Sequence, residues 1–570
     1  MTYRLAFLDQ INTEGARDFV LRPDYFTGVP FVGTAGLSFM GSEYEGTRYP
    51  AGLLSISPVS RQVRAWRWQA SHGTPDVTVD PTAIDPDSLR RGSVWELIAL
   101  TRSESGLLWR CLLDRVRLKK DSGGWRYVLS FVDIAAMTAR ASPDTDDLTL
   151  FSYAGQTTTM TSNAGAAATT YNVASTADFF ARSAPGTRGL LRGEPSSGSA
   201  DPFLAGWTAK TATSFTVYAG GQYGTTKTGM SSGSTVVSLG YFEGHPARFA
   251  QEIYTGESPG ASRSVADSGY LRLPPHMWNQ PDSEARYAET SDLEYAFWTD
   301  APVQMEAVAD WLGIGGWFPT MCHGLVTCRT LPDVGAYWTT TVRPDPKHIL
   351  RMSDLAVRGT GSAPIRLETD LYGSGEWQLE YLQTAVATQA GTALAPSTAT
   401  AEKRAYPTLS EYRIDLDNSA TEVSFHTYLS PSGIHAGSSY GLPLVMRTRR
   451  IETQRSAVHM PQNGPALYAT TANNLELARR LSPYIVHAPQ ILTATFAGPH
   501  PEYTLGDPIL FAEDWDLPAA VGGTIAGLQG MIAGTSMDVL GLTHTVTIWI
   551  PPQRSIPFAA AGAAVRDPQA

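Results

Sequence analysis

Leu108-Trp-Arg-Cys-Leu-Leu-Asp-Arg-Val116, followed by Asp121-Ser-Gly-Gly124 and Tyr127-Val-Leu-Ser-Phe131, is the stretch that decides the fold class. In its first part, large apolar residues and polar residues alternate with a period of two, as they do again after the turn. A period of two on both sides of a Gly-containing turn is typical of two antiparallel strands. The stretch therefore predicts a β-hairpin rather than a helix.

The same pattern surrounds this hairpin from about residue 53 to residue 140. Val63, Ala65 and Arg67 alternate with their neighbours, Val77-Thr-Val79 is a short strand ended by Asp80-Pro81, and Val94–Leu100 is a longer one. Strands separated by turn signals at this spacing favour an antiparallel barrel or sandwich. We expect a first β-barrel over residues 53–150, with a short closing helix at Ile134–Arg140.

Residues 151–240 differ in composition from the rest of the chain. Only 8 of these 90 residues are charged, and Ser, Thr, Gly and Ala dominate. Thr169–Val173 and Thr213–Tyr218 still have strand patterns. We interpret the segment as a small β domain inserted into a larger unit.

Residues 241–349 show a mixed pattern. Met305, Val308, Ala309 and Leu312 would share one face of a helix over 302–312. After it, Trp317-Phe318 and Leu325–Leu331 flank His323-Gly324, which predicts a hairpin. In that hairpin we expect Cys322 and Cys328 to face each other. The region is predicted to be an α+β domain.

The pattern of strands returns from residue 350 to residue 552, where we expect a second barrel containing one helix at Asn473–Leu481. The strands expected here are Glu411–Leu416, Glu422–Tyr428, Ile491–Phe496 and Leu542–Ile550. Residues 1–52 look like an irregular segment that docks onto another surface, and residues 553–570 like a tail. The fold class is therefore mainly β and multidomain, with two related barrels, an inserted small β domain and a smaller α+β part.

Composition excludes several classes of protein. The chain has 570 residues, 42% of them hydrophobic and 17% charged, so it has ample material for cores and is not disordered. Its formal charge of −11 argues against a protein that coats nucleic acid. Three cysteines are too few for a disulfide scaffold and fit a reducing cytoplasm. We also expect no secretion signal and no membrane span, because no apolar run approaches about 18 residues.

Candidate chemical motifs are weak throughout. Gly437-Ser-Ser-Tyr-Gly441 matches a nucleophile elbow, but prolines lie on both sides where that motif needs a strand and a helix. Cys322, His323 and Cys328 lack the fourth ligand of a closed zinc site. His500-Pro-Glu502 and Asp514-Trp-Asp516 offer carboxylates of the kind glycosidases use, but they resemble solvated loop ends. Arg447-Thr-Arg-Arg450 reads best as a charged strand edge.

No Gly-rich loop of the phosphate-binding kind is present, since Gly313-Ile-Gly315-Gly316 has the wrong spacing and follows an expected helix. We therefore expect no enzyme activity, and no catalytic, cofactor-binding or metal-binding residues. The expected cofactor is none.

Several segments, in this order along the chain, resemble hub proteins of the tail tip or baseplate of tailed bacteriophages. The segments similar to the first barrel, the helix and hairpin, and the second barrel of that family are Gly73–Val79, Leu89–Trp95, Trp109–Val116, Trp125–Asp133, Ala301–Leu331, Tyr503–Leu510, Gly530–Gly534 and Leu542–Ile550. They cover about 300 residues.

The inserted segment is similar to a small β module of phage tail and adaptor proteins. The similarity rests on Phe215–Tyr218, Gly221–Thr226 and Gly233–Val236. The arginine usual before Gly-Gln-Tyr-Gly is replaced by Gly220, and the usual following histidine is absent. Contacts made by those two residues in the module therefore do not carry over.

The resemblance implies a structural virion protein that forms a homotrimer. Three chains with two barrels each would make a pseudo-sixfold ring that continues the tail tube, supports tail assembly and lets DNA pass during ejection. Its partners would be the distal tail protein, the tail tube ring, the tape measure protein and a central fibre or receptor-binding protein. It would lie at the distal end of the tail, after assembly in the host cytoplasm. DNA would pass without sequence-specific binding, which a negative net charge suits.

Two other functions stay open on the sequence. The Trp and Tyr content and the Ser/Thr/Gly-rich insert suit a receptor- or glycan-binding module. A carboxylate-dependent hydrolase using Asp514 and Asp516 is the less favoured alternative.

Overall fold

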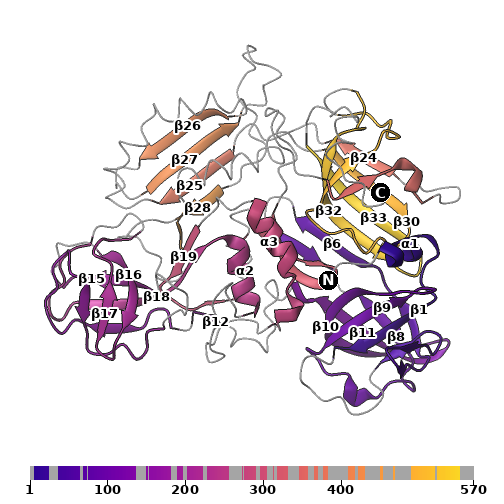
Figure 1. Ribbon diagram of the computed structural model, residues 1–570, viewed down its shortest axis with the longest axis horizontal. Coiled ribbons are helices and arrows are strands. Elements are labelled where there is room, and N and C mark those ends of the chain that lie inside the picture. Colours follow the sequence, from indigo (N-terminus) through magenta and orange to yellow (C-terminus); the bar gives the residue numbers. More distant parts are fainter. Residues whose placement is uncertain are drawn as a thin grey trace.

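The computed structural model shows a β-rich chain arranged as several sheets, with two of them side by side at one end (Figure 1). This confirms the mainly β, multidomain fold class. The structure describes residues 5–24, 36–64, 69–73, 75–135, 149–151, 153–180, 189–196, 202–222, 227–255, 273, 275–289, 295–304, 312, 317–330, 346–356, 365–369, 377–382, 409–416, 422–429, 450–453, 466–468, 490–519 and 523–551.

The first barrel is a seven-stranded sheet formed mainly by residues 18–133. Its strands, in spatial order, are β2 (Leu37–Ser38), β1 (Asp18–Pro23), β9 (Val94–Leu100), β10 (Ser105–Asp121), β11 (Gly124–Asp133), β8 (Asp76–Val79) and β5 (Leu53–Ile56). A bridge between Ser38 and Ala51 brings the two ends of this path together. The interior is lined by large apolar side chains, among them Trp95, Trp109 and Phe131, which are fully buried.

The second barrel is formed by the C-terminal part of the chain. Its strands, in spatial order, are β23 (His348–Leu350), β31 (Pro508–Phe511), β32 (Gln529–Asp538), β33 (Thr543–Ile550), β30 (Gln490–Ala497) and β24 (Ile365–Thr369). The chain that leaves β23 bridges back to β30 through Leu355 and Phe496. Every second residue of β30 and β33 is buried, as the alternation in the sequence predicts.

The two barrels have the same strand order. Numbered along the chain, the six strands β1, β5, β8, β9, β10 and β11 lie in the spatial order 1-4-5-6-3-2, and so do β23, β24, β30, β31, β32 and β33. One pairing differs, because β1 runs antiparallel to β9 whereas β23 runs parallel to β31. The second barrel is therefore antiparallel except at this pair.

A β-bulge occurs at the same place in both barrels. The register of β10 on β11 shifts between Leu113 and Arg115, and the register of β32 on β33 shifts between Ile532 and Gly534. In each case the extra residue lies on the fifth strand. Because bulges bend a strand at a defined point, the two barrels share the position of this bend as well as their strand order.

Residues 59–72 differ from the sequence-based expectation. β6 (Val59–Arg64) and β7 (Gln69–His72) form a hairpin in the connection between β5 and β8, but β6 pairs with β32 of the second barrel. Period-two alternation predicts a strand and its faces, but it carries no information on the partner strand. The first barrel is thus completed without β6 and β7.

The N-terminal segment is not irregular where the structure describes it. α1 (Leu5–Thr13) buries Phe7 and Ile11, and β1 pairs along its whole length with β9. The expectation of an irregular docking segment was wrong for these residues, because strand β1 is short and its partner lies more than seventy residues away. β3 (Glu43–Tyr44) and β4 (Thr47–Arg48) add a small hairpin.

The inserted segment forms its own sheet, far from the barrels in Figure 1. Its strands are β13 (Thr157–Thr159), β14 (Thr170–Asn172), β15 (Gly189–Glu194), β16 (Phe203–Lys210), β17 (Ser214–Val217) and the first half of β18 (Thr235–Gly244). Tyr171, Trp207 and Phe215 lie in a core of their own. The second half of β18 pairs with β19 (Tyr295–Thr299), which pairs with β29 (Ala466–Tyr468).

The α+β part lies between the insert and the barrels. α2 (Pro246–Thr255) and α3 (Gln280–Glu289) pack on the hairpin of β21 (Trp317–Cys322) and β22 (Leu325–Thr330). The hairpin is confirmed, and His323 and Gly324 have the positive φ that its tight turn requires. Of the helix expected at 302–312, Val303–Gln304 is instead strand β20, Leu312 is helical, and residues 305–311 lie outside the described residues. β20 pairs with β12 (Thr149–Leu150).

The cysteine pairing expected in this hairpin was wrong. Cys322 pairs with Leu325 and Cys328 pairs with Pro319, so the two cysteines are not opposite each other. A two-residue turn at His323-Gly324 places the strand register so that Cys322 flanks the turn, three residue pairs away from Cys328.

A four-stranded sheet completes the described part of the chain. Its order is β26 (Leu409–Leu416), β27 (Glu422–Leu429), β25 (Trp377–Leu382) and β28 (Arg450–Thr453), and it includes the two strands expected at 411–416 and 422–428. The helix expected at Asn473–Leu481 and the tail at 553–570 lie outside the described residues, as does most of the closing helix expected at Ile134–Arg140.

Candidate functional site

The candidate site is the junction between the two barrels. β6 leaves the first barrel and adds to β32 of the second, with Ser60 opposite Ser536 and Arg61 opposite Thr535. Val59 is buried in the core of the first barrel, whereas Val63 is buried in the core of the second. One strand therefore contributes to both interiors.

An ion pair holds β6 to the first barrel as well. Arg61 Nε and Nη2 donate to the two carboxylate oxygens of Asp133, at 2.6 and 2.9 Å. Asp133 is the last residue of β11 and its side chain is fully buried. Paired, parallel hydrogen bonds from a guanidinium set both the distance and the orientation of its partner. β6 is thus bound to one barrel through its backbone and to the other through this side chain.

Helix α1 makes a second bridge between the barrels. Gln10 Nε2 donates to Ser103 Oγ (2.7 Å) in the first barrel. Asn12 Nδ2 donates to Glu502 Oε1 (3.3 Å), and the backbone N–H of His500 donates to Asn12 Oδ1 (2.9 Å), both in the second barrel. The two bridges hold the barrels in one relative orientation.

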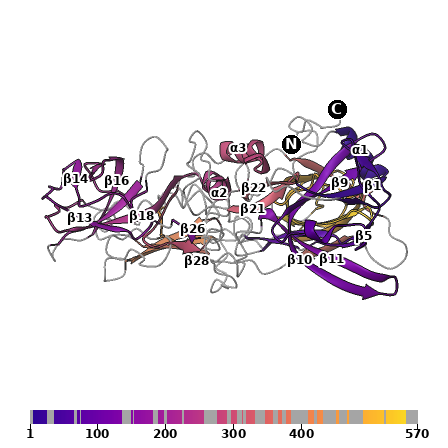
Figure 2. The same ribbon diagram turned by 90° about the horizontal axis from the view of Figure 1, so that it is seen from below.

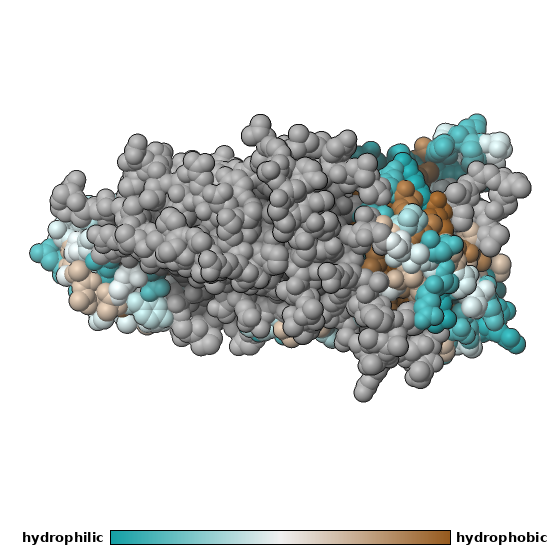
Figure 3. Space-filling model, turned by 90° about the horizontal axis from the view of Figure 1, so that it is seen from above, coloured by the Kyte–Doolittle hydropathy of each residue, from teal (hydrophilic) through white to brown (hydrophobic). Residues whose placement is uncertain are grey.

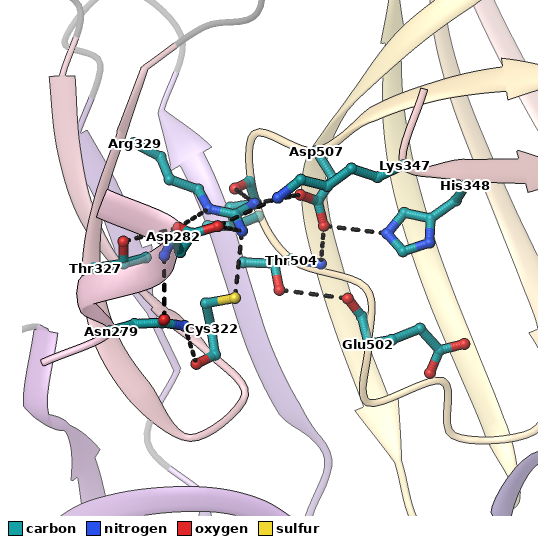
Figure 4. A network of polar contacts seen from close by, with 11 residues as sticks. Asn279, Asp282, Cys322, Thr327, Arg329, Lys347, His348, Glu502, Thr504 and Asp507 are labelled. Atoms are coloured by element: carbon teal, nitrogen blue, oxygen red, sulfur yellow. Dashed lines mark hydrogen bonds and ion pairs between the residues drawn. The ribbon is translucent and has the colours of Figure 1, made fainter. Parts of the chain in front are cut away.

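A buried ionic network joins the second barrel to the α+β part (Figure 4). Arg329 of β22 is 1% exposed and lies between two carboxylates. Its Nη2 and Nε donate to Asp282 of α3 at 2.7 and 3.0 Å, and its Nη1 donates to Asp507, just before β31. Lys347 Nζ lies 3.2 Å from Asp282 and 3.1 Å from Asp507. Two cations therefore balance two anions, with Arg329 and Asp507 buried and Lys347 about one-third exposed at the edge of the site.

The remaining polar atoms of this network are also satisfied. Asp507 Oδ2 accepts from the backbone N–H of Thr504 (3.0 Å) and lies 3.2 Å from His348 Nε2. Asp282 Oδ2 also accepts from Thr327 Oγ1 (2.8 Å). Buried charges are tolerated only when paired and hydrogen-bonded in this way.

Local electrostatics keeps these groups ionised. Burial alone would raise the pKa of Asp282 and of Asp507, but the nearby Arg329 and Lys347 outweigh burial and hold both pKa values below the usual range. Burial acts to lower the pKa of Arg329, yet the two carboxylates raise it well above its ordinary value. The contacts of Arg329 therefore orient three segments relative to one another: α3, β22 and the residues that lead into β31.

The cysteines are poor candidates for chemistry. Burial raises the pKa of all three thiols, Cys111, Cys322 and Cys328, so they stay protonated at neutral pH. Cys322 Sγ accepts from Arg329 Nη2 at 3.3 Å, and Cys328 is fully buried. Among the described residues, no group of three or more His, Cys, Asp or Glu side chains is placed to hold a metal ion.

The acidic residues considered in the sequence analysis either lie away from the Arg329 network or make structural hydrogen bonds. Asp514 and Asp516 are exposed on either side of buried Trp515, and Asp514 caps the backbone N–H of Ser353 (3.0 Å). His500 Nδ1 lies 2.9 Å from Glu502 Oε1, in contact with α1. Gly437–Gly441, residues 447–449 and residues 313–316 lie outside the described residues, and Arg450 begins β28.

Sequence reasoning missed Asp282, Arg329 and Asp507. A partial signal existed for α3, because Asn279 caps it, Pro281 follows at its start, and Asp282 lies in its first turn. Nothing in the sequence indicates that Arg329 reaches both Asp282 and Asp507, which is 178 residues away. α2 was also missed, although Pro246 at its first position is a typical start signal.

The fold and junction define a multidomain β protein built on two related barrels. No family model matches the chain, and no curated protein matches it. Solved structures similar to it include a tail protein from Neisseria meningitidis, with 10% identity, a TM-score of 0.33, and 94% of this chain and 96% of that chain covered. The 43 kDa tail protein of prophage MuSo2 from Shewanella oneidensis is similar at 9% identity and a TM-score of 0.32, covering 93% of this chain and 98% of that one.

A chain of a gene transfer agent virion is also similar, at 10% identity and a TM-score of 0.16, covering 39% of this chain and 79% of that chain. The first two of these structures are tail proteins and the third is part of a virion particle. No helix among the described residues is long and apolar enough to cross a membrane.

Proposed function

We propose that this chain is a structural protein of a phage-type tail, a hub at its tip, in which three copies form a ring of six barrels. The observation that carries the proposal is the shared strand order of the two barrels, with the bulge at the same place. A threefold assembly presents a pseudo-sixfold ring only if each chain supplies two units of the same shape held side by side. The β6 and α1 bridges supply that rigid pairing.

The described residues support a role in assembly rather than catalysis. The buried charges of Asp282, Arg329 and Asp507 pair with one another. The three cysteine thiols are buried and protonated. Apolar side chains gather beside hydrophilic ones at the end of the molecule where the barrels lie (Figure 3), as on a surface that docks other subunits. In this role the ring continues the tail tube and lets DNA pass, and its partners are the tube ring, the distal tail protein, the tape measure protein and a central fibre or receptor-binding protein.

The proposal is tested by the mass and shape of the purified protein. We expect light scattering to give about three times the chain mass of 61.5 kDa, and negative-stain images to show six lobes around a hole. A protein that stays monomeric at the concentrations used for tail assembly contradicts the proposal. A ring with three unlike lobes contradicts the equivalence of the barrels.

A further inference from the structure

The two barrels differ at one edge of their fifth strands. In the second barrel this edge, on β32, is paired with β6. In the first barrel the same edge, on β10, has no strand neighbour among the described residues. β9 pairs with β10 only as far as Leu112, whereas β11 follows β10 on its other side to Asp121. From Arg115 onward, β10 therefore has one paired side and one open side. Figure 2 shows the β10–β11 hairpin reaching out beyond the body of the molecule.

The equivalent edge in the second barrel shows what can occupy it. β31 pairs with β32 only up to Met531, and after the bulge Gly534–Met537 pairs with β6. When the two bulges are aligned, Arg115–Leu118 of β10 correspond to Gly534–Met537 of β32. The strand that fills the edge of β32 comes from the connection between the second and third strands of the first barrel.

The open edge of β10 carries exposed apolar side chains of the kind usually covered by a neighbouring strand. Val116 and Leu118 are 37% and 55% exposed, and both are large and apolar. The residues that flank a two-residue turn, here Asp121 and Gly124, exchange both backbone hydrogen bonds. Along an antiparallel strand, residues whose N–H and C=O groups point toward the partner alternate with residues whose groups point away from it. Counted from Asp121, the N–H and C=O groups of Val116 and Leu118 point away from β11. An open edge with apolar side chains is a template for another strand.

We propose that the edge Arg115–Lys120 of β10 takes up strand β26 (Leu409–Leu416) from a second copy of this chain. β26 lies in the connection between β24 and β30, which are the second and third strands of the second barrel, as β5 and β8 are of the first. The inference rests on the proposed ring, in which the second barrel of one chain meets the first barrel of the next. In that ring, the pairing of β26 with β10 would repeat between two chains the contact that β6 makes with β32 within one chain.

Two further features favour β26 as the occupant. It is the last strand of its four-stranded sheet, so one of its edges is unpaired among the described strands. Its sequence places Glu411 and Asp415 at alternate positions around Arg413, with Tyr412, Ile414 and Leu416 between them. The open edge of β10 has the opposite charge, with Arg115, Arg117 and Lys119 alternating with Val116 and Leu118. With Glu411 and Asp415 opposite Arg115 and Lys119, two opposite-charge pairs favour pairing and outnumber the one like-charge pair, Arg413 with Arg117, and Arg117 is already paired with Asp76.

The variant that tests this proposal is Leu118→Pro, with Leu118→Thr as its matched control. Proline removes the outward N–H at a position where an edge strand tolerates it, whereas threonine keeps the N–H and the strand propensity. We expect Leu118→Pro to raise the concentration at which the trimer dissociates by about tenfold or more, and Leu118→Thr to stay closer to wild type. Circular dichroism of both variants checks that the barrels are folded.

A second measurement uses the unaltered chain. Carbodiimide couples adjacent amines and carboxylates, so it should join Lys119 or Lys120 to Glu411 or Asp415. Mixing unlabelled and 15N-labelled chains before assembly identifies links between copies by mass spectrometry. If the wild type is a trimer but the links fall elsewhere, or Leu118→Pro assembles as well as Leu118→Thr, this inference is wrong and the proposed ring stands. If the wild type is a monomer, the ring itself is wrong and the inference falls with it.

Discussion

Arg61 and Asp133 join the two barrels through a bidentate ion pair in which the carboxylate is fully buried. Arg61 lies on β6, whose backbone belongs to the sheet of the second barrel, while Asp133 ends β11 of the first. Asp133 Oδ1 also accepts a hydrogen bond from Cys111 Sγ at 3.3 Å. This guanidinium therefore acts together with the backbone pairing of β6 on β32 and the α1 bridge in setting the orientation of one barrel relative to the other.

Replacing Arg61 by methionine should destabilise this junction. The substitution leaves the buried carboxylate of Asp133 without its cation, which typically costs about 3–5 kcal/mol. We expect the midpoint of urea unfolding to fall and the Trp fluorescence of the two barrels to change in separate steps. Arg61→Lys keeps the charge but not the paired geometry, so it should recover only part of the loss. A methionine variant as stable as the wild type contradicts the role given to this pair.

Removing Arg329 should change how stability depends on pH. In the wild type the folded pKa values of Asp282 and Asp507 are lowered, because Arg329 and Lys347 outweigh burial. Groups with lowered folded pKa values contribute stability above their unfolded value of about 3.8, and that contribution is lost as the pH falls through the folded values. We expect Arg329→Met to lose about 3–5 kcal/mol at pH 7, and to lose less than wild type on further acidification.

The control for that variant is Arg366→Met, because the Arg366 side chain is 77% exposed. Exposed pairs contribute little, so its unfolding curve should overlay the wild-type curve at every pH. Equal acid sensitivity of Arg329→Met and the wild type would show that the Asp282–Arg329–Asp507 contacts do not determine acid stability.

The sequence was sufficient to predict elements whose partners are close in the chain. The alternation around Asp121-Ser-Gly-Gly124 predicted β10 and β11, and His323-Gly324 predicted the hairpin of β21 and β22. These pairings depend on local turn chemistry and on one buried face, both of which the sequence displays.

Pairings over long distances were not predictable in the same way. β6 pairs with β32 at a separation of more than 470 residues, and the network of Arg329 depends on Asp507 at a separation of 178. A period of two in β6 looks the same whichever sheet the strand joins. An arginine in a strand likewise has the sequence pattern of a surface residue until the folded chain surrounds it.

Two histidines, the buried His544 and the partly buried His323, should make the protein less stable in mild acid. Burial, together with the charge of His500, lowers the pKa of His544 to about 4, and burial together with the charge of Arg329 lowers the pKa of His323 to about 4. Between the unfolded pKa of about 6.5 and the folded value, the unfolded chain binds more protons than the folded chain. Stability should therefore fall as the pH drops from about 6.5 to 4, by roughly 2–3 kcal/mol per histidine.

His544→Asn tests this dependence, because the asparagine amide can still donate to the Pro499 carbonyl that His544 Nδ1 contacts at 2.6 Å. Between pH 7 and pH 4.5, the unfolding free energy of the variant should decrease by about half as much as that of the wild type. Urea unfolding curves at the two pH values provide the measurement. An unchanged slope would mean that His544 becomes protonated in the folded protein.

Gly189→Ala should destabilise the insert without disturbing the barrels. Gly189 of β15 is paired with Trp207 of β16, and a Cβ on Gly189 would lie 2.7 Å from Trp207 Cε2, inside the separate core of the insert. Overpacking of this kind costs about 1–3 kcal/mol. Hydrogen exchange should speed up in peptides from β15 and β16 and stay unchanged in β10 and β30. Gly220→Ala is the matched control, because a Cβ on Gly220 would have no heavy atom within 4 Å beyond its chain neighbours. Faster exchange in the barrels of Gly189→Ala would instead show that the insert and the barrels unfold together. In that case a change in the insert would also affect the barrels that form the proposed ring.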